Sequence, residues 1–173
     1  ETVALTKAMK QNEADRLKAA DAYMQVCAAY IERNQKDLEK AIAQAATAEG
    51  QAAALQLTKE IALANTIVDM GNSIRIGTWQ ATATRDPKLL EDTEKIFEQV
   101  NKTLDTLKAG TTDPSDQKEI ETCRAAGGDY LKCMQDYLKN WLAREDVGKK
   151  RGEVAQQVLD AAKNTALSGS CIS

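Results

Sequence analysis

Apolar residues recur at alternating spacings of three and four through the first third of the chain. This spacing places them on one face of an α-helix and predicts a seam that packs against neighbouring helices at shallow angles. Asn34 is the single polar residue in the seam, and Gly50 is the single helix breaker. We therefore expect a first helix from about residue 3 to residue 49, which either ends at Gly50 or continues with a kink. The seam comprises Leu17, Ala20, Met24, Cys27, Ile31, Leu38, Ala41, Ala45, Ala48, Ala52 and Leu55.

Two further helices are predicted on either side of Asp86-Pro87. The second runs over about 51–83 and stops before Asp86, which is a good N-cap with a proline at the first helical position after it. The third runs over 87–108 and closes at Gly110, a typical C-terminal cap.

Asp113-Pro114 repeats the same cap and starts a fourth helix that carries spaced aromatic residues. A last apolar set lies beyond residues 147–148. The patterns together predict an all-α protein, an antiparallel bundle of four or five long helices with little or no strand. The last apolar set is Val154, Val158, Ala161 and Ala162.

A short pattern occurs twice, in residues 21–31 and again in residues 128–138. Each copy has two tyrosines seven residues apart with a cysteine between them. We interpret residues 1–57 as the closing helix of a first helical module and residues 58–173 as a second, complete module, joined in one continuous bundle. The tyrosines are Tyr23 and Tyr30 in the first copy and Tyr130 and Tyr137 in the second.

Composition argues against most kinds of catalysis. The chain has no histidine, which removes the commonest general base and the commonest transition-metal ligand. Phosphate-binding glycine loops and nucleophile elbows are missing from the sequence. The net charge is −3 and the basic residues are scattered, which does not favour nucleic acid as a partner. We expect a protein that is not an enzyme and that needs no metal or cofactor.

No segment approaches the roughly 20 apolar residues of a membrane span. The sequence begins at Glu1 within a helical pattern, so we expect an excised ectodomain or internal fragment.

Four cysteines occur without the spacing of a zinc site, which favours an extracytoplasmic protein with one or two disulfides over a cytosolic bundle of reduced thiols. Cys123 and Cys171 lie equally far from residues 147–148, so a chain reversal there predicts a Cys123–Cys171 bridge. The alternative is that the helix continues and Cys171 stays unbridged. Cys27 and Cys133 hold similar places in the two copies of the repeat and are expected as small core residues.

The segment around Arg75 differs from the rest of the chain. Asn72, Arg75 and Trp79 share one helical face, with Thr78 at its border, and the arginine lies among apolar residues. A guanidinium on a face resembling a core needs an acceptor, and a carboxylate fits its fork. That carboxylate belongs either to an internal acid or to a small anionic ligand held between helices.

Tyr130 and Tyr137 are candidates to complete such a pocket, because a buried tyrosine usually directs its hydroxyl to a partner. The alternative is that the tyrosines only fill wide layers of a bundle rich in alanine.

The Arg75 segment and its sequel resemble the helical bimodular ligand-binding domain of bacterial methyl-accepting chemotaxis receptors and related sensor kinases. The resemblance covers about residues 62–166. It rests on an arginine-bearing helix, a threonine followed by an Asp-Pro turn, a glutamate-rich helix and spaced aromatics. These are Ile74-Arg75, Trp79, Thr84, Asp86-Pro87, Tyr130 and Tyr137.

The resemblance implies an extracytoplasmic, periplasmic sensor domain of a membrane-anchored inner-membrane protein. Such a domain would bind a small organic acid between helices and signal by a small helix shift or a change of dimer state, which allows for a homodimer. Arg75 is the implied ligand arginine, whereas the second arginine of the family pattern is replaced by Thr78. The alternative from the residues is a structural helical or coiled-coil module that binds partner helices and no small ligand.

Overall fold

The computed structural model describes residues 2–170, with side chains as far as residue 167. These residues form five helices joined by short connections, so the predicted all-α class is confirmed. The helices are α1 (Thr2–Ala43), α2 (Ala48–Thr84), α3 (Pro87–Glu94), α4 (Ile96–Gly110) and α5 (Pro114–Ser170).

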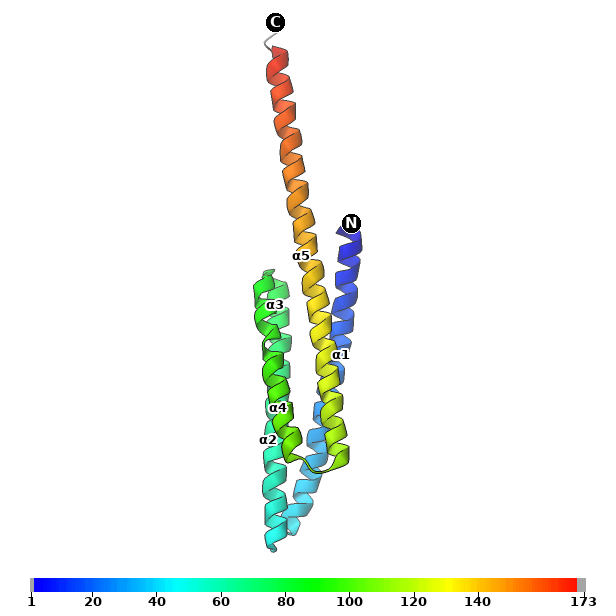
Figure 1. The fold of residues 1–173 in the computed structure, drawn as a ribbon, viewed down its shortest axis with the longest axis vertical. Helices are drawn as coiled ribbons and strands as arrows, with labels where there is room; N and C mark the ends of the chain where they lie inside the picture. The colour runs from blue at the N-terminus through cyan, green and yellow to red at the C-terminus, as the bar shows by residue number, and fades with distance from the viewer. Residues whose placement is uncertain (1, 171–173) are drawn as a thin grey trace.

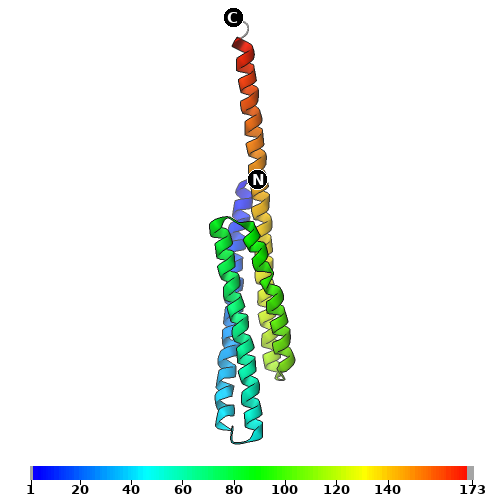
Figure 2. The same ribbon diagram turned by 90° about the vertical axis from the view of Figure 1, so that its left-hand side faces the viewer.

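The helices form an antiparallel bundle (Figures 1 and 2). α1 packs against α2 and α5, and the α3–α4 pair closes the ring by packing against both α2 and α5. α5 is the longest element and extends well beyond the start of α1, at the end of the bundle where both chain termini lie. No helix among residues 2–170 combines the length and the apolar character needed to cross a membrane.

The core follows the predicted spacing of three and four, and Ala20, Cys27 and Ala41 of the predicted α1 seam are buried, but Arg16, Tyr23 and Tyr30 take the places of Leu17, Met24 and Ile31. Tyr23 and Tyr30 are buried, whereas Leu17 is more than half exposed and Met24 and Ile31 are only half-buried. This arrangement places the large aromatic rings in the interior. The buried residues of α1 are Met9, Arg16, Ala20, Tyr23, Cys27, Tyr30, Asn34 and Ala41.

The predicted end of the first helix near residue 49 is wrong. α1 ends at Ala43, and a turn leads to Thr47, whose side chain accepts a hydrogen bond of 3.1 Å from the Gly50 amide. Gly50 thus lies in the first turn of α2 and does not break a helix. A Cβ at this position would overlap the carbonyl of Gln44, so the glycine allows the turn to fold back closely on α2.

The Asp86 cap is confirmed, because its side chain accepts a 3.0 Å hydrogen bond from the Lys88 amide. The predicted third helix is divided at Lys95 into α3 and α4.

Of the two alternatives at residues 147–148, the chain reversal is wrong and the continuing helix is confirmed, because α5 runs through this point. Gly148 is exposed and does not interrupt α5. The proposed Cys123–Cys171 bridge required this reversal of the chain and is therefore no longer supported. Cys171 itself lies outside the described residues. The boundary proposed between residues 57 and 58 falls inside α2.

Two glycines give a matched test of how closely α1 and α2 pack. A Cβ on Gly71 would lie 2.6 Å from the ring of Tyr23, which is held by a 2.9 Å hydrogen bond from its hydroxyl to the Ile67 carbonyl. We expect Gly71→Ala to lower the free energy of unfolding by about 1 to 3 kcal/mol through overpacking. Gly128→Ala, which meets no atom within 4 Å, should raise it by about 0.5 to 1 kcal/mol. Urea unfolding of both variants tests this, and equal effects would contradict it.

Candidate functional site

An open groove of about 630 Å³ lies between α1 and α2, with one residue of α5 contributing to its wall. The faces that line it come from the half of the bundle nearer the chain termini. The α1 residues are Glu13, Arg16, Leu17 and Ala20; the others are Asn72, Arg75, Ile76, Trp79 and Thr82 from α2 and Tyr130 from α5.

Arg16 is the unusual member of this groove. It occupies a core position of the α1 seam and is only 9% exposed, yet its Nε has no hydrogen-bond partner. Among the ion pairs formed by residues 2–167, none involves Arg16 or the exposed Arg75. Burying the Nε of Arg16 without an acceptor is costly, because the hydration that this N–H group loses is not replaced. The groove therefore contains two cations, Arg16 and Arg75, and neither forms an ion pair with a residue of the groove wall.

The groove combines this charge with apolar and hydroxyl groups. Trp79 is 70% exposed, and Leu17 and Ile76 are exposed beside it. Tyr130 is buried, with its ring edge-on to Phe97 at 5.7 Å between centroids, and no hydrogen bond of the described residues involves its hydroxyl. By contrast, the Tyr23 hydroxyl is bonded to a backbone carbonyl.

Glu13 is the one acid on the groove wall, and no ion pair joins it to Arg16 within the described residues. Two arginines against one carboxylate leave the lining with one net positive charge. Arginine forks bind carboxylates in a planar, two-bonded geometry, and an indole face covers apolar carbon. The arrangement suits a small anion with an apolar part.

Four of the six predicted ligand residues line the groove together: Asn72, Arg75, Trp79 and Tyr130. Thr78 does not, because it is buried and its hydroxyl donates to the Ile74 carbonyl at 2.7 Å. The sixth, Tyr137, packs edge-on against Trp141 at 5.9 Å between ring centroids and lies elsewhere in the core.

The predicted environment of Arg75 is wrong, since this side chain and its neighbours Ile76 and Trp79 face outward and not into a core. Sequence reasoning also missed Arg16. Its signal was present: Arg16, Ala20 and Tyr23 continue the spacing of four and three, so a charged residue holds a core position. The predicted seam was placed through Leu17 and Met24, so the core position of Arg16 was not recognised.

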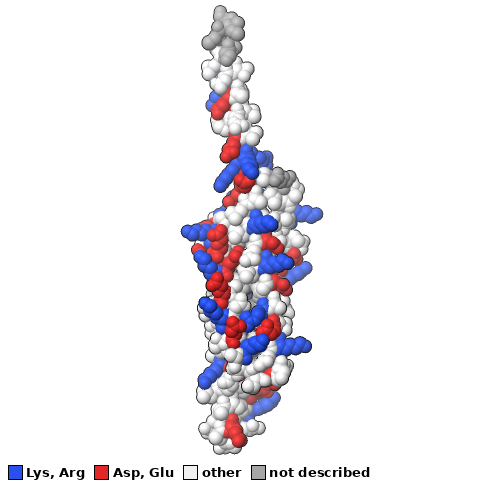
Figure 3. Space-filling model, in the orientation of Figure 1, with Lys and Arg blue, Asp and Glu red and all other residues white. Residues whose placement is uncertain are grey.

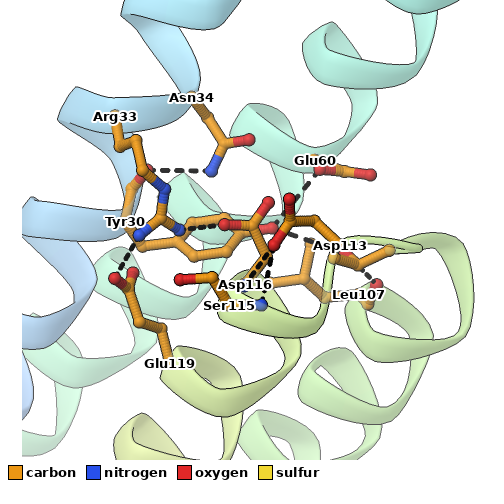
Figure 4. A network of polar contacts seen from close by, with 10 residues as sticks. Tyr30, Arg33, Asn34, Glu60, Leu107, Asp113, Ser115, Asp116 and Glu119 are labelled. Carbon is orange, nitrogen blue, oxygen red and sulfur yellow. Dashed lines mark hydrogen bonds and ion pairs between the residues drawn. The ribbon is translucent and has the colours of Figure 1, made fainter.

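A second polar cluster lies nearer the other end of the bundle (Figure 4). Arg33 of α1 forms ion pairs with Asp116 and Glu119 of α5. The Tyr30 hydroxyl, beside Arg33, lies 3.4 Å from a carboxylate oxygen of Glu60 on α2. This cluster contains its own acids and cation and ties α1, α2 and α5 together, while Oε2 of Glu119 is buried without a hydrogen-bond partner.

Burial controls the titration of this cluster. It raises the pKa of the Asp116 carboxyl above its usual range, and the Arg33 charge offsets part of that rise. Burial likewise raises the pKa of Tyr30 to about 12.

Charges of both signs are mixed over the face of the molecule shown in Figure 3, without a large patch of one sign. Among residues 2–167 no group of three or more Cys, Asp or Glu side chains could hold a metal ion. Comparison of the chain with protein-family models, curated proteins and solved structures found no match.

The unpaired charge of Arg16 predicts a stability gain on its removal. We expect Arg16→Met, measured without ligand, to raise the free energy of unfolding by about 1 kcal/mol, because methionine fills similar space without a buried charge. The matched control is Arg75→Met, which should change stability by less than about 0.5 kcal/mol because Arg75 is exposed. A loss of stability in Arg16→Met would show that Arg16 has a stabilising partner.

Removing Arg33 should give a stability defect that depends on pH. In Arg33→Met the pKa of Asp116 rises further above its unfolded value. The folded state is then penalised at neutral pH, and the penalty shrinks as the pH falls and Asp116 takes up a proton. We expect a loss of about 1 to 2 kcal/mol at pH 7 that narrows towards pH 4, measured by urea unfolding against the parent chain. A loss that does not vary with pH would contradict this account of the cluster.

Proposed function

We propose that the groove between α1 and α2 binds a small organic acid and that the chain is the extracytoplasmic, periplasmic sensor domain of a membrane-anchored chemoreceptor or sensor kinase. The observation that carries this proposal is the buried Arg16, unpaired on the same groove wall as Arg75. Costly buried polar groups cluster at functional sites, where a bound ligand of opposite charge offsets the cost.

The chemistry of the groove defines the ligand class. Arg16 and Arg75 come from facing helices, so one carboxylate or two on the same molecule can bridge α1 and α2. The Tyr130 hydroxyl offers a further hydrogen bond, and Trp79 covers an apolar part of the ligand. Arg16 on α1 fills the role of the second arginine that the sequence lacks at Thr78.

The position of the groove supports a signalling role. A ligand that draws α1 and α2 together favours one spacing of these helices over another, which shifts the population of helix arrangements. α1 begins and α5 ends at the same end of the bundle (Figure 1), so a small displacement of these helices appears at that end.

A thermal-shift screen of aliphatic and aromatic mono- and dicarboxylates tests the proposal. A ligand at a hundredfold excess over its Kd should raise the Tm of the parent chain by about 5 to 10 °C. Arg75→Ala and Arg16→Met should abolish this rise, because each removes one of the two cations. Arg151→Ala, which removes an exposed arginine of α5 outside the groove, should respond as the parent does.

Neutral amides of the same acids are matched ligand controls and should give no shift. The proposal fails if no acid shifts the parent chain, or if Arg75→Ala responds to the acid as the parent does.

Fluorescence places the ligand within the groove. The chain has two tryptophans, and Trp141→Phe leaves Trp79 as the single reporter. A ligand that covers this exposed indole should shift its emission to shorter wavelength, with the same midpoint as the thermal response. An unchanged emission at saturation would place the ligand elsewhere.

The second candidate is a helical interaction module that binds partner helices and no small ligand. It is favoured by the exposed Leu17, Ile76 and Trp79 beside the groove and by exposed apolar residues on the extension of α5, such as Val154 and Val158. Analytical sedimentation with and without organic acids separates the two candidates, because the interaction module should associate with partner helices to the same extent whether or not an acid is present.

A further inference from the structure

Two cysteines from distant parts of the chain meet in the core. Cys27 lies on α1 and Cys123 on α5, and their Sγ atoms are 3.1 Å apart. Both side chains are buried, and no intervening group separates them. A disulfide bond is about 2.05 Å long, so the sulfurs need to approach by only about 1 Å to bond.

The surroundings allow this approach. A small cavity of about 20 Å³ borders both cysteines and is lined mainly by apolar side chains such as Ile67 and Leu104. Free space beside the pair lets either side chain adjust without overpacking the core. Because both sulfurs are buried, a disulfide bond between them would be shielded from reductants in the solvent.

The structure points to one pairing. We propose that Cys27 and Cys123 form a disulfide that joins α1 to α5 when the protein folds under oxidising conditions. Cys133 does not belong to it, since that half-buried thiol lies near the acids Asp15, Asp129 and Asp136. The inference does not depend on what the groove binds.

The oxidant is a small-molecule disulfide, such as the oxidised form of glutathione. One cysteine, as the thiolate, attacks a sulfur of the oxidant and forms a mixed disulfide, releasing one small thiol. The other loses its proton and attacks the protein sulfur of the mixed disulfide, which releases the second small thiol. Two protein thiols are oxidised by two electrons, and one small disulfide is reduced to two thiols.

The two thiols share a hydrogen bond in which either sulfur can be the donor, so either cysteine can act as the first nucleophile. Because both thiols are buried, the oxidant reaches them while the bundle is forming or transiently open.

The bond would close a loop of 96 residues, which contains α2, α3 and α4. It would also fix α1 against α5 about two helical turns from the groove residue Ala20. Closing a long loop restricts the unfolded chain, so the oxidised protein should be markedly more resistant to unfolding.

Peptide mapping of the full chain tests the pairing. The protein is refolded in a glutathione redox buffer, alkylated in denaturant without reductant and digested with trypsin. We expect the peptide of residues 19–33, which contains Cys27, linked to that of residues 119–124, which contains Cys123. The linked peptide should disappear on reduction, and the peptide 133–139 should carry an alkylated cysteine. Alkylated Cys27 and Cys123, or a link from either to another cysteine, overturns the proposal.

A thermal comparison gives an independent readout. Oxidation should raise the Tm of the parent chain by about 10 °C over its reduced form. Cys133→Ala should keep this difference, whereas Cys27→Ala and Cys123→Ala should lose it. Comparing oxidised with reduced protein within each variant removes any effect of the substitution on packing. If the Cys27 or Cys123 variants fail to fold, the peptide map of the parent chain and the Tm difference of Cys133→Ala still test whether Cys27 and Cys123 are paired. Loss of the difference in Cys133→Ala contradicts the pairing.

Discussion

The packing of α1 between α2 and α5 is the constraint on which the other features depend. Both helices pack against the same face of α1, which buries the rings of Tyr23 and Tyr30 and, between them, the smaller side chain of Cys27. The close approach of α2 at Gly71 fixes the ring of Tyr23. This register brings Cys27 onto Cys123 and places the charged side chains of α1 against particular partners on α5. Both the polar cluster and the groove follow from it.

The two polar regions of the bundle, around Arg33 and around Arg16, each place an arginine of α1 against the core, but among the described residues only Arg33 is paired with carboxylates. Arg33 carries its charge into the bundle beside two carboxylates of α5 and pairs with both, which ties the start of α5 to α1. Arg16 stands on the same helix, buried as deeply as an apolar residue, and its charge meets no acid. The first arrangement is typical of structure, because the cation is paired within the chain. The second is typical of a binding site, because an added anion would pair a cation that the described residues leave without a carboxylate.

Much of the fold could be predicted because it depends on local chemistry. Spacings of three and four, the Asp86 cap and the breaks at proline predict long helices, and a short connection turns each helix back on its neighbour. The limits of α1 could not be read in the same way. Gly50 looks like a breaker in the sequence, yet it allows close contact across a turn whose N-cap is Thr47.

The sequence by itself determined the helical class, the antiparallel order and the shared face of Asn72, Arg75 and Trp79, since these depend on periodicity along one helix. The tertiary structure alone decided what faces that surface. Arg16 comes from α1 and Tyr130 from α5. The inward position of Arg16 depends on which of two overlapping stripes of α1, both of which contain Ala20 and Cys27, faces the core. The packing of α1 against α5 likewise decided that Cys123 meets Cys27. Contacts between helices depend on the packing of whole faces, which spacing within one helix does not encode.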